Sequence, residues 1–389
     1  MAETFEIEPE WVHIAYQAGS GLRDVYGYAA SLGTVNLEGV RYRPKGHRSG
    51  TLLIYMHPAS TMALLPMPRA MAAAGLDVLC AGSRYARNDT ALIMEKVALD
   101  LGAYMRHARE VWGYQRVVLS GWSGGGSLSA FYQGQAESPT VTQTPAGEPV
   151  DLSGLLPADA VIYQAAHLSR AVVLSRFIDP SVLDETNPDV RDPELDLYDP
   201  RNPHQPPYSA EYLERFRAAQ LARIRRRTTY VRELLEQVTA KDGPAAERGL
   251  ITHRTLADPW FLDPAIEPSD RPAGWSFLGK PQEANLSPAG LARYSTLRAW
   301  LSQWSLDDTN AIANTDIARV HAPLLVIENS ADDAVPPSHV KAVYQASPAA
   351  VKDYVTIKGA NHYYAGQPEQ LGEAVRTITG WLQQHGLVS

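Results

Sequence analysis

The sequence is almost devoid of cysteine: Cys80 is the single one in 389 residues. No intrachain disulfide can form, and such a composition suits a reducing compartment. Apolar runs are also short, and none approaches the ~20 residues that span a bilayer. Residues 1–10 are acidic and have neither the basic region nor the apolar core of a secretory signal. These absences predict a soluble, cytoplasmic protein.

Basic residues are not in excess either. The chain has 35 Lys and Arg against 43 Asp and Glu, a formal net charge of −8, which does not favour nucleic acid or an anionic membrane as a partner. There is no H-E-x-x-H sequence, no dinucleotide fingerprint and no P-loop, and one cysteine cannot build a thiolate metal site. We therefore expect no cofactor, no metal and a small molecule as the partner.

Apolar residues are abundant by comparison. They make up 45% of the chain, which is enough to bury a sizeable core of one or two domains. Short apolar strands alternate with helical patterns, and this alternation predicts a mostly parallel sheet with helices on both faces. The predicted strands are 24–29 and 40–43 (an antiparallel pair), 51–56, 76–80, 116–120, 160–165, 323–327 and 354–357, and the predicted helices among them are 67–74, 90–112 and 127–135.

The segment GWSGG at 121–125 carries the clearest chemical pattern. It fits G-x-S-x-G and stands between the strand 116–120 and the helix 127–135. A serine at such a turn has a strained backbone, so the residues two before and two after it must be small. The helix that follows directs its free N–H groups at the turn, where negative charge would develop. We predict Ser123 to be a nucleophile; the alternative is a glycine-rich loop that merely ends a strand.

His362 is the predicted general base. A serine hydroxyl is a weak nucleophile near neutral pH and needs a base within hydrogen-bond reach. His362 follows the strand 354–357 and the small residues Gly359 and Ala360. These small residues let the loop pass close over the carboxyl edge of the sheet, where ligands bind in such folds.

Three acidic residues follow the strand 323–327: Glu328, Asp332 and Asp333. The acid must hold the imidazole in the right tautomer and stabilise its charged form. With the order serine, acid, histidine and a strand before each loop, the chain resembles the α/β-hydrolase fold family over the sheet-forming segments at both ends of the sequence. That family's aspartate stands four residues before a proline. The resemblance therefore implies Asp332, four before Pro336, with Asp333 as the alternative or as a solvated charge at a helix start.

The resemblance also implies an oxyanion hole. One donor is the N–H of Gly124, and the other comes from the loop after the strand 51–56. Family members often have His-Gly before the donor residue, where this chain has His57-Pro58-Ala59. Pro58 has no N–H, so alignment on this motif points to Ala59, with Ser60 as an alternative. We further expect contacts with the substrate from Trp122, His57, His167 and Tyr363, with His57 also supporting the oxyanion loop.

The middle of the chain does not share the resemblance. The alternation stops after 160–165 for about 150 residues, which is too long for a bare connection, and helices are predicted at 210–239 and 288–305. The family implies a cap there, over 168–320, leaving a core of 1–167 and 321–389. Its aromatic residues suit a bulky apolar ligand, although core packing is the commoner role for each of them: Tyr208, Trp260, Phe261, Trp275, Phe277, Trp300 and Trp304.

The same region contains a run of arginines that could bind an anion or face solvent. Arg223-Ile-Arg-Arg-Arg227 could clamp a carboxylate or a phosphate. A solvated helix face is the preferred interpretation, with nearby acids such as Glu214 and Glu233 balancing the charge.

These features together predict a serine hydrolase that cleaves a carboxylic ester or lactone of a bulky, largely apolar small molecule through an acyl-enzyme. A C–C bond hydrolase acting on a diketone-type intermediate is the close alternative, and a peptidase or amidase a weaker one, because fold and triad are shared while the pocket decides. A hydrolase-like receptor is disfavoured because Ser123, Asp332 and His362 are all intact.

Overall fold

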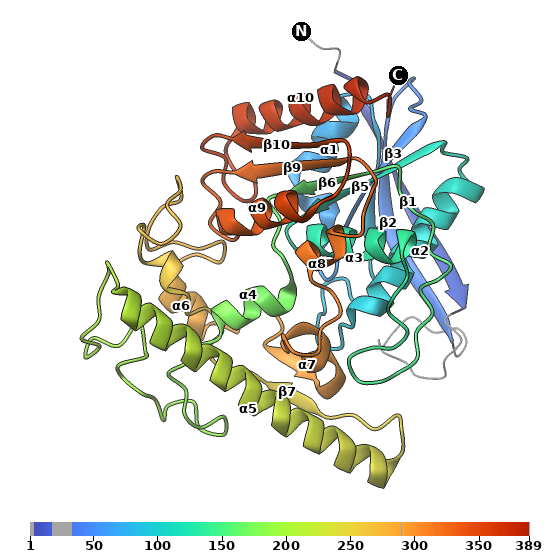
Figure 1. Cartoon of the computed structure of the whole chain (residues 1–389). Helices are drawn as coiled ribbons and strands as arrows, with labels where there is room; N and C mark the ends of the chain where they lie inside the picture. The colour runs from blue at the N-terminus through green and yellow to red at the C-terminus, as the bar shows by residue number, and fades with distance from the viewer. Residues whose placement is uncertain (1–3, 18–32, 289, 389) are drawn as a thin grey trace.

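The computed structural model describes residues 4–17, 33–288 and 290–388. Its centre is an eight-stranded sheet in the order β1-β2-β4-β3-β5-β6-β9-β10 (Figure 1). The neighbouring strands β4, β3, β5, β6, β9 and β10 run parallel to one another. Strand β2 is antiparallel to both of its neighbours, β1 and β4. The mostly parallel sheet is thus confirmed. The strands are β1 Ile7–Gln17, β2 Thr34–Pro44, β3 Thr51–His57, β4 Asp77–Gly82, β5 Arg116–Trp122, β6 Ala160–Gln164, β9 Leu324–Asn329 and β10 Lys352–Ile357.

Helices cover both faces of this sheet, as the alternation predicts (Figure 1). The central strand β3 is buried along its whole length, because Leu52 and Ile54 point into one apolar cluster while Leu53 and Tyr55 point into the opposite one. Helices α1 and α10 pack on the second of these faces, and α2 and α3 on the first. The helices around the sheet are α1 Pro66–Ala73, α2 Met94–Glu110, α3 Gly124–Glu137, α8 Ala313–Ile317, α9 Pro337–Ala346 and α10 Pro368–Gln384.

The beginning of the chain differs from the prediction. Of the two early strands, 40–43 lies inside β2, and 24–29 lies outside the described residues. The first strand, β1, was not predicted. It is an edge strand, so its neighbour-free side tolerates Pro9, and only Val12 and Ile14 turn fully into the core. Trp11 on its other face is 65% exposed, which weakens the apolar alternation that would reveal the strand.

Residues 168–305, here called the outer segment, leave the sheet after β6 and lie beyond the carboxyl ends of the strands (Figure 1). The long helix α5 confirms the prediction of 210–239, starts on the side-chain cap of Ser209 and ends before Gly243. The helix predicted at 288–305 is only partly correct, because Tyr294–Thr296 pairs as strand β8 with β7. The elements are α4 Arg170–Phe177, α5 Ala210–Asp242, β7 Gly249–Ile251, α6 Pro281–Leu286, β8 Tyr294–Thr296 and α7 Leu297–Gln303.

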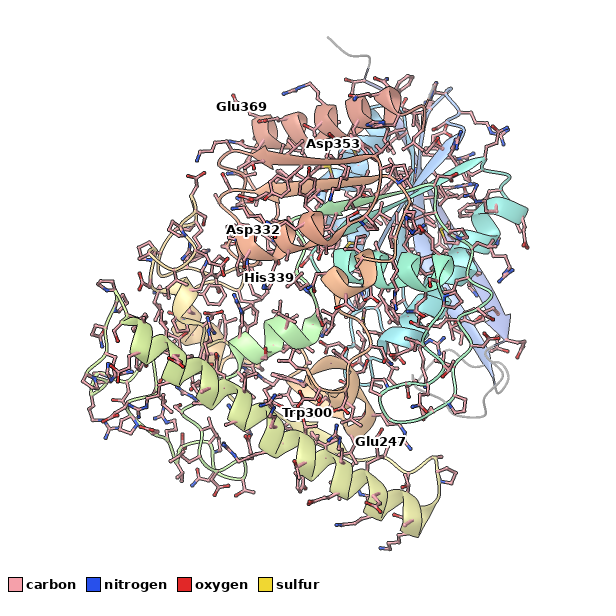
Figure 2. The ribbon with its side chains drawn as sticks, in the orientation of Figure 1. Glu247, Trp300, Asp332, His339, Asp353 and Glu369 are labelled. Carbon is pink, nitrogen blue, oxygen red and sulfur yellow. The ribbon has the colours of Figure 1, made fainter. Side chains whose placement is uncertain are left out.

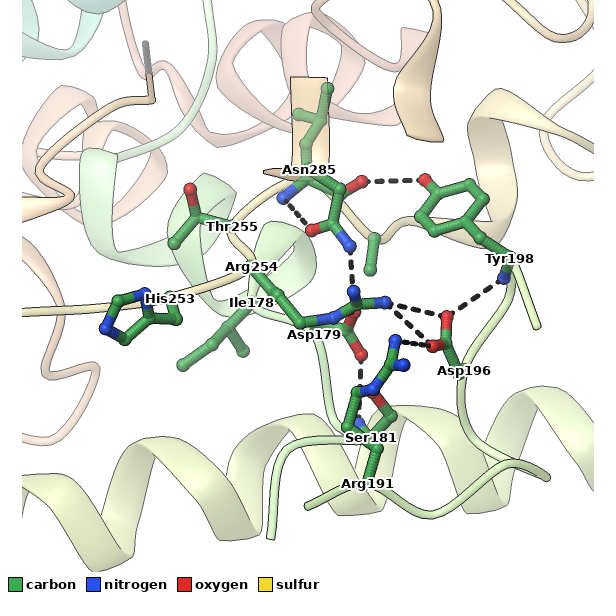
Figure 3. A network of polar contacts seen from close by, with 12 residues as sticks. Ile178, Asp179, Ser181, Arg191, Asp196, Tyr198, His253, Arg254, Thr255 and Asn285 are labelled. Carbon is green, nitrogen blue, oxygen red and sulfur yellow. Dashed lines mark hydrogen bonds and ion pairs between the residues drawn. The ribbon is translucent and has the colours of Figure 1, made fainter. Parts of the chain in front are cut away.

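A buried polar network ties loops of the outer segment together (Figure 3). Arg254 donates from Nε to Asp179 (2.7 Å) and from Nη2 to both carboxylate oxygens of Asp196 (2.8 Å each). Asn285 completes the shell of Asp179 with a 2.8 Å hydrogen bond. Burial of these charges is tolerable because each has a charged or polar partner.

The run of arginines in α5 divides between the interior and the surface. Arg223 and Arg227 are buried, and both pair with Glu185, at 2.7 Å and 2.5 Å. Arg225 and Arg226 are exposed. The prediction of a solvated face is therefore wrong for the first and last arginines, which stand four residues apart and so share the inward face of the helix.

Among the described residues, no helix combines the length and the apolar character needed to cross a bilayer.

Candidate active site

Ser123 stands at a sharp turn between β5 and α3. Its backbone has φ 55° and ψ −125°, a left-handed conformation that non-glycine residues rarely adopt. A Cβ on Gly121 would lie 2.5 Å from the carbonyl oxygen of Gly125, and a Cβ on Gly125 would lie 2.3 Å from the carbonyl oxygen of Met56. Both positions must be glycine because backbone atoms occupy the space, which is the reason for the G-x-S-x-G spacing.

The structure brings the three predicted side chains together in series. His362 Nε2 lies 3.2 Å from Ser123 Oγ, and His362 Nδ1 lies 2.9 Å from Asp332 Oδ2. The three residues come from the loops after β5, β9 and β10, at the carboxyl edge of the sheet, and Figure 2 labels Asp332 where this edge meets the outer segment. His362 and Asp332 are buried, at 1% and 4% exposed, so bulk water does not compete for their hydrogen bond.

The acid loop separates its three carboxylates. Asp332 faces His362, and its second oxygen accepts the N–H groups of Ala334 and Val335 at 2.8 Å each, which fixes the carboxylate. Glu328 instead bonds to the hydroxyl of Tyr354, away from the histidine. Asp333 is partly buried, and its Oδ1 is buried without a partner among the described residues, so at least this oxygen does not face solvent.

Aromatic rings surround the histidine. Trp122 donates from Nε1 to the carbonyl of His362 (2.9 Å), and the two rings lie 4.4 Å apart between centroids. The rings of Tyr363 and Phe277 lie 4.9 Å and 6.4 Å from the same imidazole. Phe277 brings the outer segment to the triad. The sequence offered no signal that separates this ring from the other aromatic residues of the segment.

Most of the other aromatic residues of the outer segment pack in its own interior. Trp260, Phe261, Trp300 and Trp304 are at most 1% exposed and belong to its apolar clusters. Trp275 is 46% exposed. The expectation that core packing is the commoner role is confirmed for the four buried rings, and they offer no surface to a ligand.

The predicted oxyanion donors differ in whether their N–H groups already have an acceptor. Gly124 is the first residue of α3, so its N–H has no acceptor within the helix and faces the turn at Ser123. The N–H of Ala59 donates to Nδ1 of His57 (3.1 Å), and the N–H of Ser60 donates to the same atom (2.9 Å). Both amides thus have an acceptor in this structure, and the assignment of Ala59 as the second donor, with Ser60 as the alternative, stays a prediction.

Two further histidines, His167 and His339, are buried. Burial, the nearby Arg170 guanidinium and His362 lower the pKa of His167 to about 3, so this imidazole is neutral. Its Nδ1 has no partner among the described residues, and the same holds for both ring nitrogens of His339, which Figure 2 labels on α9. The sequence predicts a helix around His339, which α9 confirms, but it does not predict the burial of this side chain, because a histidine within a helix carries no sign of burial.

This chain is similar to known proteins in its fold rather than in its sequence. The sequence matches no protein-family model and no curated protein. Alpha/beta hydrolase GrgF from Penicillium sp. sh18 is structurally similar, with a TM-score of 0.53 and 11% identity over 97% of this chain and 99% of that chain. DcsB, solved in complex with its substrate analogue, gives a TM-score of 0.50 and 15% identity over 97% and 99% of the two chains. The sheet order, the turn at Ser123 and these likenesses together show that the chain has the α/β-hydrolase fold.

Proposed function

We propose that this protein is a serine hydrolase that cleaves a carboxylic ester or lactone bond through an acyl-enzyme intermediate. The observation that carries the proposal is the hydrogen-bonded series from Ser123 Oγ through His362 to Asp332, with distances of 3.2 Å and 2.9 Å. Such a series is what a weak hydroxyl nucleophile needs: a base in contact with it, and an acid that orients the base.

The chemistry follows from these positions. His362 Nε2 takes the proton of Ser123 as Oγ attacks the carbonyl carbon, and the Asp332 carboxylate stabilises the imidazolium through Nδ1–H. The Gly124 N–H stabilises the negative oxygen of the tetrahedral intermediate. The leaving alcohol departs with the proton from Nε2. Water then gives a proton to His362 and attacks the acyl carbon, which releases the acid and restores Ser123.

We also propose that residues 168–320 form a cap over this site, with 1–167 and 321–389 as the catalytic core. A cap excludes water and shapes the pocket. The rings of Trp122, Tyr363 and Phe277 beside the imidazole support a bulky, largely apolar substrate as the finer form of the proposal.

Labelling with a fluorophosphonate tests the mechanism. We expect the purified protein to be modified at Ser123, with mapping by mass spectrometry, and we expect it to hydrolyse nitrophenyl esters. Ser123→Ala should abolish both, and Ser127→Ala, a nearby serine whose hydroxyl donates to the carbonyl of Gly124, should still be labelled at Ser123. Modification of a different serine, or turnover of vinylogous diketones but no ester, would contradict the proposal.

A further inference from the structure

We propose that His57 donates the second hydrogen bond of the oxyanion hole through its side-chain Nε2–H, in place of a backbone amide. This inference rests on the proposed role of Ser123 as the nucleophile. It concerns the loop after β3, where the hydrogen bonds differ from the expected arrangement.

The loop itself has no free amide at the expected positions. Pro58 has no N–H, and the N–H groups of Ala59 and Ser60 both donate to Nδ1 of His57, at 3.1 Å and 2.9 Å. A backbone amide that already has an acceptor is poorly placed to stabilise a developing charge. The loop amides bind Nδ1 of the imidazole, and Nε2 on the other side of the ring lies beside Gly124.

These two hydrogen bonds also define the tautomer of His57. A ring nitrogen that accepts two N–H groups carries no proton, so the proton of the neutral imidazole is on Nε2. The ring stays neutral because burial, reinforced by Arg170 and His167, holds its pKa well below the usual range. His57 therefore has one donor, Nε2–H, and no hydrogen-bond acceptor for it is found among the described residues.

The position of Nε2 matches the proposed role. A Cβ on Gly124 would lie 2.7 Å from Nε2 of His57 and 3.2 Å and 3.3 Å from the two adjacent ring carbons. The imidazole thus packs against the α-carbon of the residue that supplies the first donor. The pattern G-x-S-x-G leaves this position open, but here a side chain at residue 124 would displace His57.

The step is balanced without any proton transfer to the oxyanion. As Ser123 Oγ forms its bond to the carbonyl carbon, the π pair of the carbonyl moves onto oxygen. That oxygen accepts hydrogen bonds from the Gly124 N–H and from His57 Nε2–H, and both protons stay on nitrogen. When the pair returns to re-form the carbonyl, the leaving group departs with the proton that His362 took from Ser123.

Two variants of His57 separate donation from support of the loop. In His57→Asn the amide oxygen can replace Nδ1 as the acceptor for Ala59 and Ser60, but no donor reaches the position of Nε2. In His57→Gln the side-chain amide nitrogen can reach that position. A donor role predicts that His57→Asn lowers kcat about 10²–10³-fold with KM changed less than about threefold, and that His57→Gln regains roughly tenfold.

The controls keep the two roles distinct. His321→Asn, a matched change at an exposed histidine, should turn over esters at the wild-type rate. A purely supporting role for His57 predicts the reverse order, with His57→Asn more active than His57→Gln, and this result would overturn the inference. The wild-type tautomer offers a test that needs no variant: nitrogen NMR should find His57 protonated on Nε2 alone, and a proton on Nδ1 would overturn the inference as well.

Failure of this inference and failure of the proposed function look different. If the proposed function fails, wild-type Ser123 is not labelled by the fluorophosphonate. If only the inference fails, wild-type Ser123 is labelled and His57→Asn hydrolyses esters as fast as the wild type.

Discussion

The sheet core and the outer segment are stabilised in different ways. The core has apolar clusters on both faces of the sheet, and burial of this kind is non-directional. The outer segment has smaller apolar clusters and a concentration of buried arginines, each with carboxylate, carbonyl or side-chain oxygen partners: Arg170, Arg223, Arg227, Arg254, Arg271, Arg293 and Arg298.

This difference teaches where each region is sensitive to change. An apolar cluster tolerates volume-conserving swaps between apolar side chains, whereas a buried ion pair that loses one partner leaves an uncompensated charge. The core also carries the proposed catalytic groups at its edge, so changes there should affect turnover more than folding. Changes to the arginine pairs of the outer segment should affect folding first.

The largest effect is expected at the edge of the sheet. Ser123→Ala should lower kcat on the order of a millionfold, because serine, base and acid act as one unit. Its free energy of unfolding should change by less than about 1 kcal/mol, since Ser123 is only partly buried. Ester kinetics and urea unfolding measure the two quantities. Retention of turnover would show that the hydrolytic site lies elsewhere.

The acid gives the next largest effect. Asp332→Asn should lower kcat on the order of 10⁴-fold, because an amide no longer holds the imidazole in the productive tautomer. Asp333→Asn is the matched control and should stay within about tenfold of the wild type, since its carboxylate makes no hydrogen bond to His362. If Asp333→Asn instead caused the greater loss in the same ester assay, the two assignments would have to be exchanged.

The third prediction compares a buried arginine of the outer segment, Arg254, with an exposed one, Arg225. Arg254→Met leaves the buried carboxylates of Asp179 and Asp196 without their shared cation, so the free energy of unfolding should fall by about 3–5 kcal/mol. Arg225→Met removes an exposed pair with Asp307 and should cost less than about 1 kcal/mol. Urea titrations of both variants compare them, and equal losses would refute the contrast between buried and exposed pairs.

The smallest effect concerns pH. Burial, followed by the neighbouring Asp332, raises the pKa of Asp333 from 3.8 to about 6. The folded state therefore binds this proton more tightly than the unfolded state, so a cost to stability develops as the pH rises between these two values and is complete above about pH 6. Asp333→Asn removes the charge and should stabilise the protein by about 1–2 kcal/mol near pH 8, after allowance for solvent screening.

The same variant should gain almost nothing near pH 4, because little of the cost has developed there. Unfolding free energies at the two pH values give the measurement. An equal gain at both would mean that the charge of Asp333 is not the cause.

The sequence predicted the regular part of the fold well. The strands around Ser123, Asp332 and His362 are local apolar runs, and each residue follows its strand within a short loop, so their meeting at one edge follows from a parallel sheet. The strained turn at Ser123 could also be predicted from neighbouring residues alone, because the spacing of Gly121 and Gly125 indicates it.

What the sequence did not predict depends on partners that are distant along the chain. Arg223 and Arg227 are buried only because Glu185 meets them from a separate loop, and no window around the helix contains that information. The two amides of Ala59 and Ser60 look free in any motif alignment, until the rotamer of His57 places Nδ1 between them. The strand β1 is hidden for a simpler reason: most of its side chains are not buried.

Trp122, the last residue of β5, contacts the loop of His362, and this contact should influence its fluorescence. Its indole is hydrogen-bonded to the His362 backbone and lies 4.4 Å from the His362 ring between centroids. The emission of an indole depends on the groups in contact with its ring. A ligand that moves the His362 ring should therefore change the fluorescence of this tryptophan, so the protein carries its own spectroscopic reporter at the residue next to the serine.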